Sequence, residues 1–285
     1  KMVKRHHPQT KLIVGNSVGA SAYEAFCKNT PTDVVIVGEG EISCLETLNA
    51  YRDGLSLAGV KGIIYRDADG RAVKNPPRAT GNIDAFPMVD WDFFEVKRYI
   101  SRSENMSFGG LDASIKPISF PVTTARGCVF KCTFCHYVYW DDPYRKRSVA
   151  DVVAEIRRNI EKYGANYMAF WDDLSFSSLA QVEKMADAIL ASGLKFNWDA
   201  AVRVDLFGNP QIPRERRLAI ARKMKASGCV ATGFSLESGD EEILTLMNKK
   251  IKAEYFTEQI RVLREVGIAC NTSVVFGYPI ETKET

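Results

Sequence analysis

The chain has 285 residues, of which 46% are hydrophobic and 26% charged, and this composition is that of an ordinary globular protein. Its formal net charge is +3, from 38 basic and 35 acidic residues, so charge gives no reason to expect a nucleic acid as the main partner. No apolar run approaches the ~18 residues that cross a bilayer, and the basic start of the chain has no apolar stretch behind it that would make a secretory signal. We therefore expect a cytoplasmic protein without a membrane span.

Short β-branched segments alternate with helical segments at the start of the chain. The pattern predicts strands at 11–14 and 33–37, each ending at a glycine, with helices at 21–29 and 42–51. Strands at 62–66 and 71–74 flank an Asp-Ala-Asp-Gly turn and predict a hairpin. We assign residues 1–75 to a partial α/β domain that contains βαβ units. Residues 76–120 hold several prolines and no sustained period, so they are predicted to be a linker.

The alternation resumes with longer helices over residues 121–285. Strands are predicted at 122–125, 167–171, 196–202, 230–236 and 269–276, and helices at 148–163, 179–192, 213–227, 240–247 and 253–266. Strand, helix and glycine in repeated order indicate a (β/α) barrel. Because a closed barrel cannot end just after a fifth strand, we expect this barrel to be partial and the sequence to be truncated at its C-terminus.

The cysteines form one tight group. Seven occur in all, an odd number spread unevenly, which does not indicate a secreted disulfide framework. Cys128, Cys132 and Cys135 fall within eight residues, just after the first predicted barrel strand. Three thiolates on one loop can ligate three irons of a cubane cluster and leave the fourth iron open to a cofactor. The alternative is a zinc site that adds His136, although neighbouring ligands at 135 and 136 would suit tetrahedral zinc poorly.

This CxxxCxxC spacing, with an aromatic residue before the last cysteine, resembles the radical S-adenosylmethionine (SAM) superfamily. The resemblance implies a (β/α)6 radical SAM barrel that holds a [4Fe–4S] cluster, to which SAM binds through its amino and carboxylate groups. One electron would then break the sulfonium C–S bond and give a 5′-deoxyadenosyl radical. By the same resemblance, Phe134 would lie near the adenine of SAM.

Polar residues at the ends of later strands match the same family. The resemblance implies SAM contacts for Asp172, Arg203 and Glu237, followed by Ser238, within an "ESG…LxxMNK" run from Glu237 to Lys249. A carboxylate can accept hydrogen bonds from the SAM ammonium or ribose, and an arginine can pair with its carboxylate. The alternatives are a local capping role for Asp172 and a surface ion pair for Arg203. Gly277 begins a turn that resembles the family's "GxPxET" segment near adenine.

The first domain, residues 1–75, resembles the C-terminal part of a Rossmann-like cobalamin-binding domain. The resemblance depends on Gly15, Gly38, Glu39 and Gly40, because glycines at strand ends let a cofactor's nucleotide tail approach the backbone. A connector at residues 85–92 also matches the family. The cobalt-ligating Asp-x-His-x-x-Gly segment does not occur in the sequence, and we expect it upstream of residue 1.

The resemblance therefore implies a radical SAM enzyme of the cobalamin-binding subfamily, truncated at both ends. The expected reaction is methyl transfer from cobalamin to an unactivated carbon of a small-molecule substrate, with flavodoxin or ferredoxin as electron donor. The alternatives are a cobalamin-associated cyclisation or rearrangement without methyl transfer, or a non-catalytic iron–sulfur or zinc protein. A methylthiotransferase is disfavoured because no further cluster cysteines group in the first domain.

Overall fold

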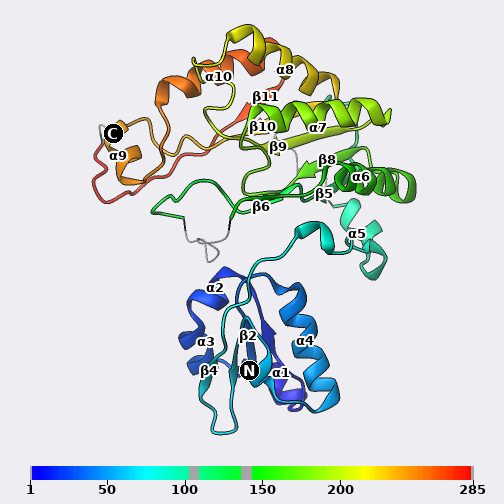
Figure 1. Ribbon diagram of the computed structural model, residues 1–285, viewed down its shortest axis with the longest axis vertical. Helices are drawn as coiled ribbons and strands as arrows, with labels where there is room; N and C mark the ends of the chain where they lie inside the picture. The colour runs from blue at the N-terminus through cyan, green and yellow to red at the C-terminus, as the bar shows by residue number, and fades with distance from the viewer. Residues whose placement is uncertain (1, 103–108, 136–142, 284–285) are drawn as a thin grey trace. The chain divides into compact units, whose positions relative to one another are not determined.

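A computed structural model describes residues 2–102, 109–135 and 143–283 (Figure 1). The chain divides into two compact units. Among the described residues, the first unit comprises 2–82 and Cys135, and the second comprises 83–102, 109–134 and 143–283. No helix in the described part of the chain is both long and apolar enough to span a bilayer.

The first unit is a four-stranded sheet with helices on both faces. Its strands are ordered β1-β2-β3-β4, with β1 and β2 parallel and the other neighbours antiparallel. Cys27 of α3 packs with one face of the sheet and Ala50 of α4 with the other. The elements are α1 (Met2–His6), β1 (Ile13–Val14), α2 (Asn16–Ser21), α3 (Tyr23–Asn29), β2 (Val34–Ile36), α4 (Gly40–Asp53), β3 (Ile63–Arg66) and β4 (Ala72–Lys74).

The predicted strands, the helix over 42–51 and the hairpin of this unit all occur, with shifted ends. The helix predicted at 21–29 is α3, which begins two residues later, whereas α2, directly before it, was not predicted. They meet at Ala22, whose backbone (φ −104°, ψ 27°) leaves the helical range and caps both helices. Since α2 begins at Asn16, directly after Gly15, the first strand is followed immediately by a helix.

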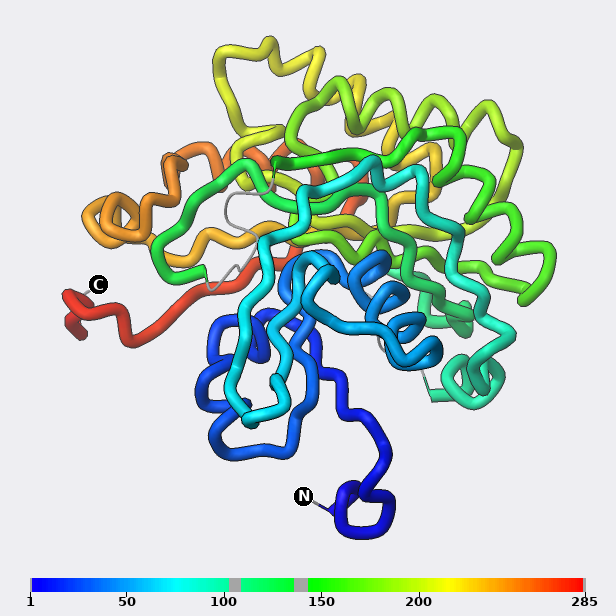
Figure 2. The backbone as a smooth tube through the Cα atoms, turned by 60° about the horizontal axis from the view of Figure 1, so that its bottom comes forward, coloured from blue at the N-terminus to red at the C-terminus, as the bar shows by residue number. Residues whose placement is uncertain are grey.

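The second unit contains a five-stranded parallel sheet in the order β11-β10-β9-β8-β5. Helices α6, α7, α8 and α10 lie in a row along one face of the sheet (Figures 1 and 2). The sheet and its helices are β5 (Ser119–Val122), α6 (Val149–Tyr163), β8 (Tyr167–Phe170), α7 (Leu179–Ser192), β9 (Asn197–Ala201), α8 (Arg214–Ala226), β10 (Cys229–Gly233), α9 (Glu241–Leu246), α10 (Ala253–Glu265) and β11 (Ala269–Asn271). Outside them are α5 (Val96–Ile100) and a two-stranded ribbon of β6 (Ala125–Arg126) and β7 (Arg145–Lys146).

Local signals explain why the predicted helices of this unit hold to within about a residue. The Ser148 hydroxyl accepts a hydrogen bond from the Asp151 amide and caps α6. Gly164 and Gly193 adopt left-handed backbone conformations (φ 69° and 70°) and end α6 and α7. Between helices and sheet lies the main core, in which Trp198 is fully buried and stacks on Phe170 with ring centroids 5.0 Å apart.

The first barrel strand was predicted in the wrong place. It occupies Ser119–Val122 instead of 122–125, and Ala125 belongs to β6, which pairs with β7 outside the main sheet. Pro121 is therefore within the strand and does not precede it. The chain leaves the sheet after Val122 because the Thr124 and Ala125 amides donate to the carboxylate of Asp172, which follows the neighbouring strand β8.

Candidate functional site

The clustered cysteines lie on the loop after β6, at the carboxyl edge of the parallel sheet. Cys128 is partly buried, Cys132 is buried and Cys135 is exposed at the end of the described part of the loop. The Cys128 Sγ accepts a hydrogen bond from the Phe130 amide at 3.5 Å. Over the described ranges, no three His, Cys, Asp or Glu side chains stand close enough together to hold a metal ion. His136, the extra ligand of the zinc alternative, lies outside the described residues.

The chemistry of the donor set fits an iron–sulfur cluster. Three thiols share one short loop, and an amide hydrogen bond already reaches one of the sulfurs, as is common around such clusters. Cys229 and Cys270, the other cysteines of this unit, are different. Burial raises the pKa of both thiols, that of Cys229 well above its ordinary value, so both remain protonated at neutral pH. Cys128, Cys132 and Cys135 are therefore chemically suited to be the cluster ligands, and this assignment stays a prediction.

Asp172, directly after β8, organises the backbone that leads into the cysteine loop. Its carboxylate accepts hydrogen bonds from the Thr124 amide (2.9 Å), the Thr124 hydroxyl (2.5 Å) and the Ala125 amide (3.3 Å). Burial raises the pKa of the Asp172 carboxyl, while these hydrogen bonds act in the opposite direction. The bonds hold the turn between β5 and β6, so Asp172 has a structural role here, and its contact with SAM stays a prediction.

Arg203 follows β9 and already has partners within the protein. Its guanidinium makes two hydrogen bonds to Asp205, at 2.9 and 2.6 Å, and lies 5.1 Å from the ring centroid of Phe130, in the cysteine loop. This pairing resembles the ion-pair alternative considered from the sequence, although the side chain is less than one-third exposed. Pairing of Arg203 with a SAM carboxylate stays a prediction.

Glu237, after β10, forms a buried ion pair. Its carboxylate lies 2.9 Å from the Lys249 ammonium, with the two side chains only 9% and 11% exposed. The same ammonium lies 5.9 Å from the ring centroid of Phe134. Lys249 therefore joins two residues predicted to contact SAM. Ser238 is also buried, and its hydroxyl accepts a hydrogen bond from the Asp240 amide at 3.1 Å.

The turn at Gly277 lies near the cysteine loop through its neighbour Tyr278. Gly277 has φ 85°, and its amide donates to the Glu281 carboxylate, which also accepts from the Tyr278 amide at 3.2 Å. The Tyr278 hydroxyl bonds the Thr133 hydroxyl at 2.8 Å. Sequence reasoning missed Thr133 and Tyr278, and gave Lys249 no role. The only available signal was the Glu237–Lys249 run, which was recognised as a motif without a function.

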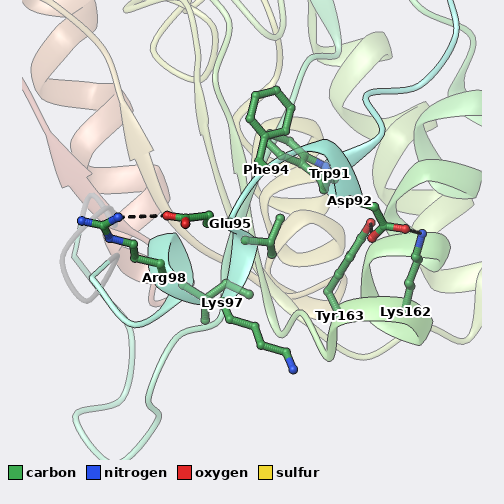
Figure 3. A pocket seen from close by; sticks show the side chains of 10 residues that line it. Trp91, Asp92, Phe94, Glu95, Lys97, Arg98, Lys162 and Tyr163 are labelled. Atoms are coloured by element: carbon green, nitrogen blue, oxygen red, sulfur yellow. Dashed lines mark hydrogen bonds and ion pairs between the residues drawn. The ribbon is translucent and has the colours of Figure 1, made fainter.

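A cavity of about 700 Å³ lies elsewhere in the second unit (Figure 3). Its walls come from the segment at 91–100 and from Lys162 and Tyr163 at the end of α6. Asp92 joins the two walls, pairing with Lys162 and accepting a hydrogen bond from the Tyr163 hydroxyl at 2.9 Å (Figure 3). Because α6 ends where β8 is about to begin, this cavity lies at the amino edge of the sheet, opposite to the cysteine loop.

The glycines predicted to approach cobalamin lie at strand ends in the first unit. Gly15 directly follows β1 and precedes α2, with open space where a side chain would be. Gly38 follows β2 with φ 86°, and Glu39 and Gly40 begin α4. All four therefore lie at the carboxyl edge of the two parallel strands of this sheet.

A family comparison decides the identity of the second unit. The model of the radical SAM superfamily matches residues 122–285, more than half of the chain. The chain belongs to the radical SAM superfamily. The matched radical SAM region begins at the end of β5 and includes the cysteine loop and every later strand of the parallel sheet. The family prediction and the α/β fold with a parallel sheet are therefore confirmed.

Other known proteins resemble all or nearly all of this chain. An uncharacterized methyltransferase of Pyrococcus horikoshii is 28% identical over all of this chain and 58% of its own length. An anaerobic magnesium-protoporphyrin IX monomethyl ester cyclase of Rubrivivax gelatinosus is 26% identical over all of this chain and 49% of its own length. The chain thus spans about half the length of these relatives. Among solved structures, the cobalamin-dependent SAM radical enzyme OxsB, with aqua-cobalamin and SAM bound, shares the fold with a TM-score of 0.75 at 20% identity, over 92% of this chain and 36% of its own.

Proposed function

We propose that this chain is part of an enzyme that cleaves SAM reductively at a [4Fe–4S] cluster held by Cys128, Cys132 and Cys135. The observation that carries the proposal is a loop with three thiols at the carboxyl edge of a parallel sheet, the edge at which barrel enzymes build their sites, in a chain that belongs to the radical SAM superfamily. When bound, the cluster would supply one electron to the SAM sulfonium, which would yield methionine and a 5′-deoxyadenosyl radical. An electron donor such as flavodoxin or ferredoxin would provide that electron.

The remaining site residues would bind and orient SAM. Glu237 would accept hydrogen bonds from the SAM ammonium or ribose, Arg203 would pair with the carboxylate, and Phe134 would lie against the adenine. Asp172 would fix the start of the loop, while Ser238 and Gly277 would form walls of the same site. In support, Glu237 and Lys249 make their buried ion pair close to Phe134, and Arg203 lies against Phe130 of the same loop.

We further propose that the first unit is part of a Rossmann-like cobalamin-binding domain and that the reaction is methyl transfer to an unactivated carbon of a small molecule. Support comes from Gly15, Gly38, Glu39 and Gly40, which gather at the carboxyl edge of a parallel strand pair, where α4 begins. A relative named as a methyltransferase and the shared fold of a cobalamin-dependent enzyme add to it. The cyclase relative favours the second candidate, cyclisation without methyl transfer.

The test uses protein expressed from the complete open reading frame, reconstituted anaerobically with iron and sulfide and reduced with dithionite. We expect 5′-deoxyadenosine to form from SAM, and Cys128→Ala, Cys132→Ala and Cys135→Ala each to abolish it. Cys270→Ala is the matched control, because this thiol is also partly buried but lies on β11, and it should keep activity. Wild-type protein that contains no cubane cluster would refute the proposal. A product heavier by one CH2 would indicate methyl transfer, and an unmethylated product would indicate cyclisation.

A further inference from the structure

The cysteine loop is tied to the segment after α9, more than a hundred residues further along the chain. The Thr133 amide donates to the Met247 carbonyl at 3.0 Å, and the Thr133 hydroxyl donates to the Leu246 carbonyl at 3.0 Å. These carbonyl groups belong to the end of α9, where a helix has no partners of its own for its last acceptors. The loop therefore provides the C-terminal cap of α9, and α9 in turn holds the residue between two cysteines.

Asn248 adds a side-chain bond at the same place. Its Nδ2 donates to the Lys131 carbonyl at 2.7 Å, directly before Cys132. Asn248 adopts a left-handed backbone conformation with φ 52°, which asparagine tolerates better than most residues. Tyr278 closes the group from a third segment, since its hydroxyl donates to the Thr133 hydroxyl at 2.8 Å and lies 3.3 Å from the Leu246 carbonyl that Thr133 bonds.

We propose that Asn248, Thr133 and Tyr278 form a latch that fixes the cysteine loop for its cluster, with Asn248 as the principal positioning residue. The inference rests on the proposed function and deepens it. The latch holds the backbone on both sides of Cys132, at Lys131 and Thr133, and Cys132 is the buried member of the three cysteines. Lys249, the next residue after Asn248, pairs with Glu237 beside Phe134, so one short segment orients both the thiols and the predicted SAM contacts.

The latch can be tested in the metal-free protein by the rate at which each cysteine is alkylated with iodoacetamide, measured by peptide mass spectrometry. Asn248→Gly keeps the left-handed backbone and removes the donor, and Asn248→Asp keeps the shape but cannot donate. Because one net hydrogen bond is lost, we expect Cys132 to be alkylated about three- to tenfold faster in both variants. Lys250→Gly is the matched control, since Lys250 has a similar φ of 50°, and it should leave the rate unchanged. Cys229, which is fully buried, reports any global unfolding.

A second arm uses the reconstituted protein. The Asn248 variants and Thr133→Val should retain less iron per chain, and the electron paramagnetic resonance spectrum of the reduced cluster should respond to SAM less than in the wild type. If wild-type protein cleaves SAM while the Asn248 variants match it in thiol reactivity and iron content, the latch is refuted and the proposed function stands. If wild-type protein forms no cluster and leaves SAM intact, the proposed function fails, and with it the purpose assigned to the latch.

Discussion

Replacing Lys249 by methionine tests the ion pair at the centre of the site. The change leaves the Glu237 carboxylate, which is 9% exposed, without its cation. Breaking a buried ion pair on one side costs about 3–5 kcal/mol, and the small residual exposure here favours the lower end, about 3 kcal/mol. Glu237→Gln alone should cost less, about 1–2 kcal/mol, because the amide oxygen still accepts from Lys249. The double variant removes both charges and should lie within about 1 kcal/mol of the wild type.

The assay is urea unfolding followed by tryptophan fluorescence, which reports mainly on the second unit because three of the four tryptophans, Trp91, Trp171 and Trp198, belong to it, and Trp140 lies outside the described residues. A double-mutant cycle should give a coupling free energy of about 3–5 kcal/mol between Glu237 and Lys249, because the two single costs add to about 4–5 kcal/mol while the double variant costs at most about 1 kcal/mol. Lys252→Met is the matched control. Its 4.0 Å pair with Glu254 has both side chains about two-thirds exposed, so it should cost less than about 0.5 kcal/mol. Additive single effects, or a Lys249→Met variant as stable as the control, would contradict the reasoning.

Three further changes test how the surrounding backbone is held. Asp172→Ala leaves buried donors without an acceptor and should cost about 1–3 kcal/mol in unfolding free energy, whereas Asp172→Asn keeps an acceptor. Burial raises the pKa of the Asp172 carboxyl, so the folded state favours the protonated form. The free energy of unfolding of the wild type should therefore fall as the pH rises above the ordinary carboxyl pKa of about 3.9. In parallel urea titrations, the stability of the asparagine variant should rise relative to that of the wild type over the same pH range. Gly110→Ala would place a methyl group 2.3 Å from a β10 carbonyl oxygen and should lower the free energy of unfolding in urea by over about 2 kcal/mol. Gly109→Ala is the control, because a methyl group there meets open space, and it should cost about 1 kcal/mol. Equal costs for the two variants would refute this packing. Asp240→Ala removes the side chain that caps α9 by accepting hydrogen bonds from two amides at 2.9 Å, and it should lower the free energy of unfolding by about 1 kcal/mol, a loss that Asp240→Asn should largely avoid.

Periodicity predicted the second unit well because each element there carries its own local signal. Helix α6, for example, has an apolar face that packs into the core, a serine cap and a terminal glycine, and none of these depends on distant residues. The misplaced strand at 122–125 shows where such signals fail. Its end is set by hydrogen bonds from Thr124 and Ala125 to Asp172, which is 48 and 47 residues away from them, and no local pattern contains that information.

The cysteine loop gives the same lesson for the site. The motif predicts the three thiols as ligands from eight residues, because sulfurs this close in sequence can share one cluster. The bonds that hold the loop come from Asn248 and Tyr278, which lie 117 and 145 residues from their partners in the loop. Partners at that separation become visible only when strand order brings them to one edge of the sheet, so the residues that position the loop could not be predicted from the sequence.

Glu237 combines a strained backbone with a buried charge, and neither favours stability. Its φ of 70° lies in the left-handed region that favours glycine, a conformation that costs a larger side chain about 1–2 kcal/mol. The position is kept by neighbouring backbone, since the Glu237 amide donates to Ser273 at 3.1 Å and its carbonyl accepts from Val275 at 2.8 Å. A glycine would satisfy the same two bonds without strain, and an apolar residue would need no lysine partner. Because stability alone explains neither feature, a carboxylate held at this strand end supports the proposal that it binds a cationic ligand, as the SAM ammonium would require.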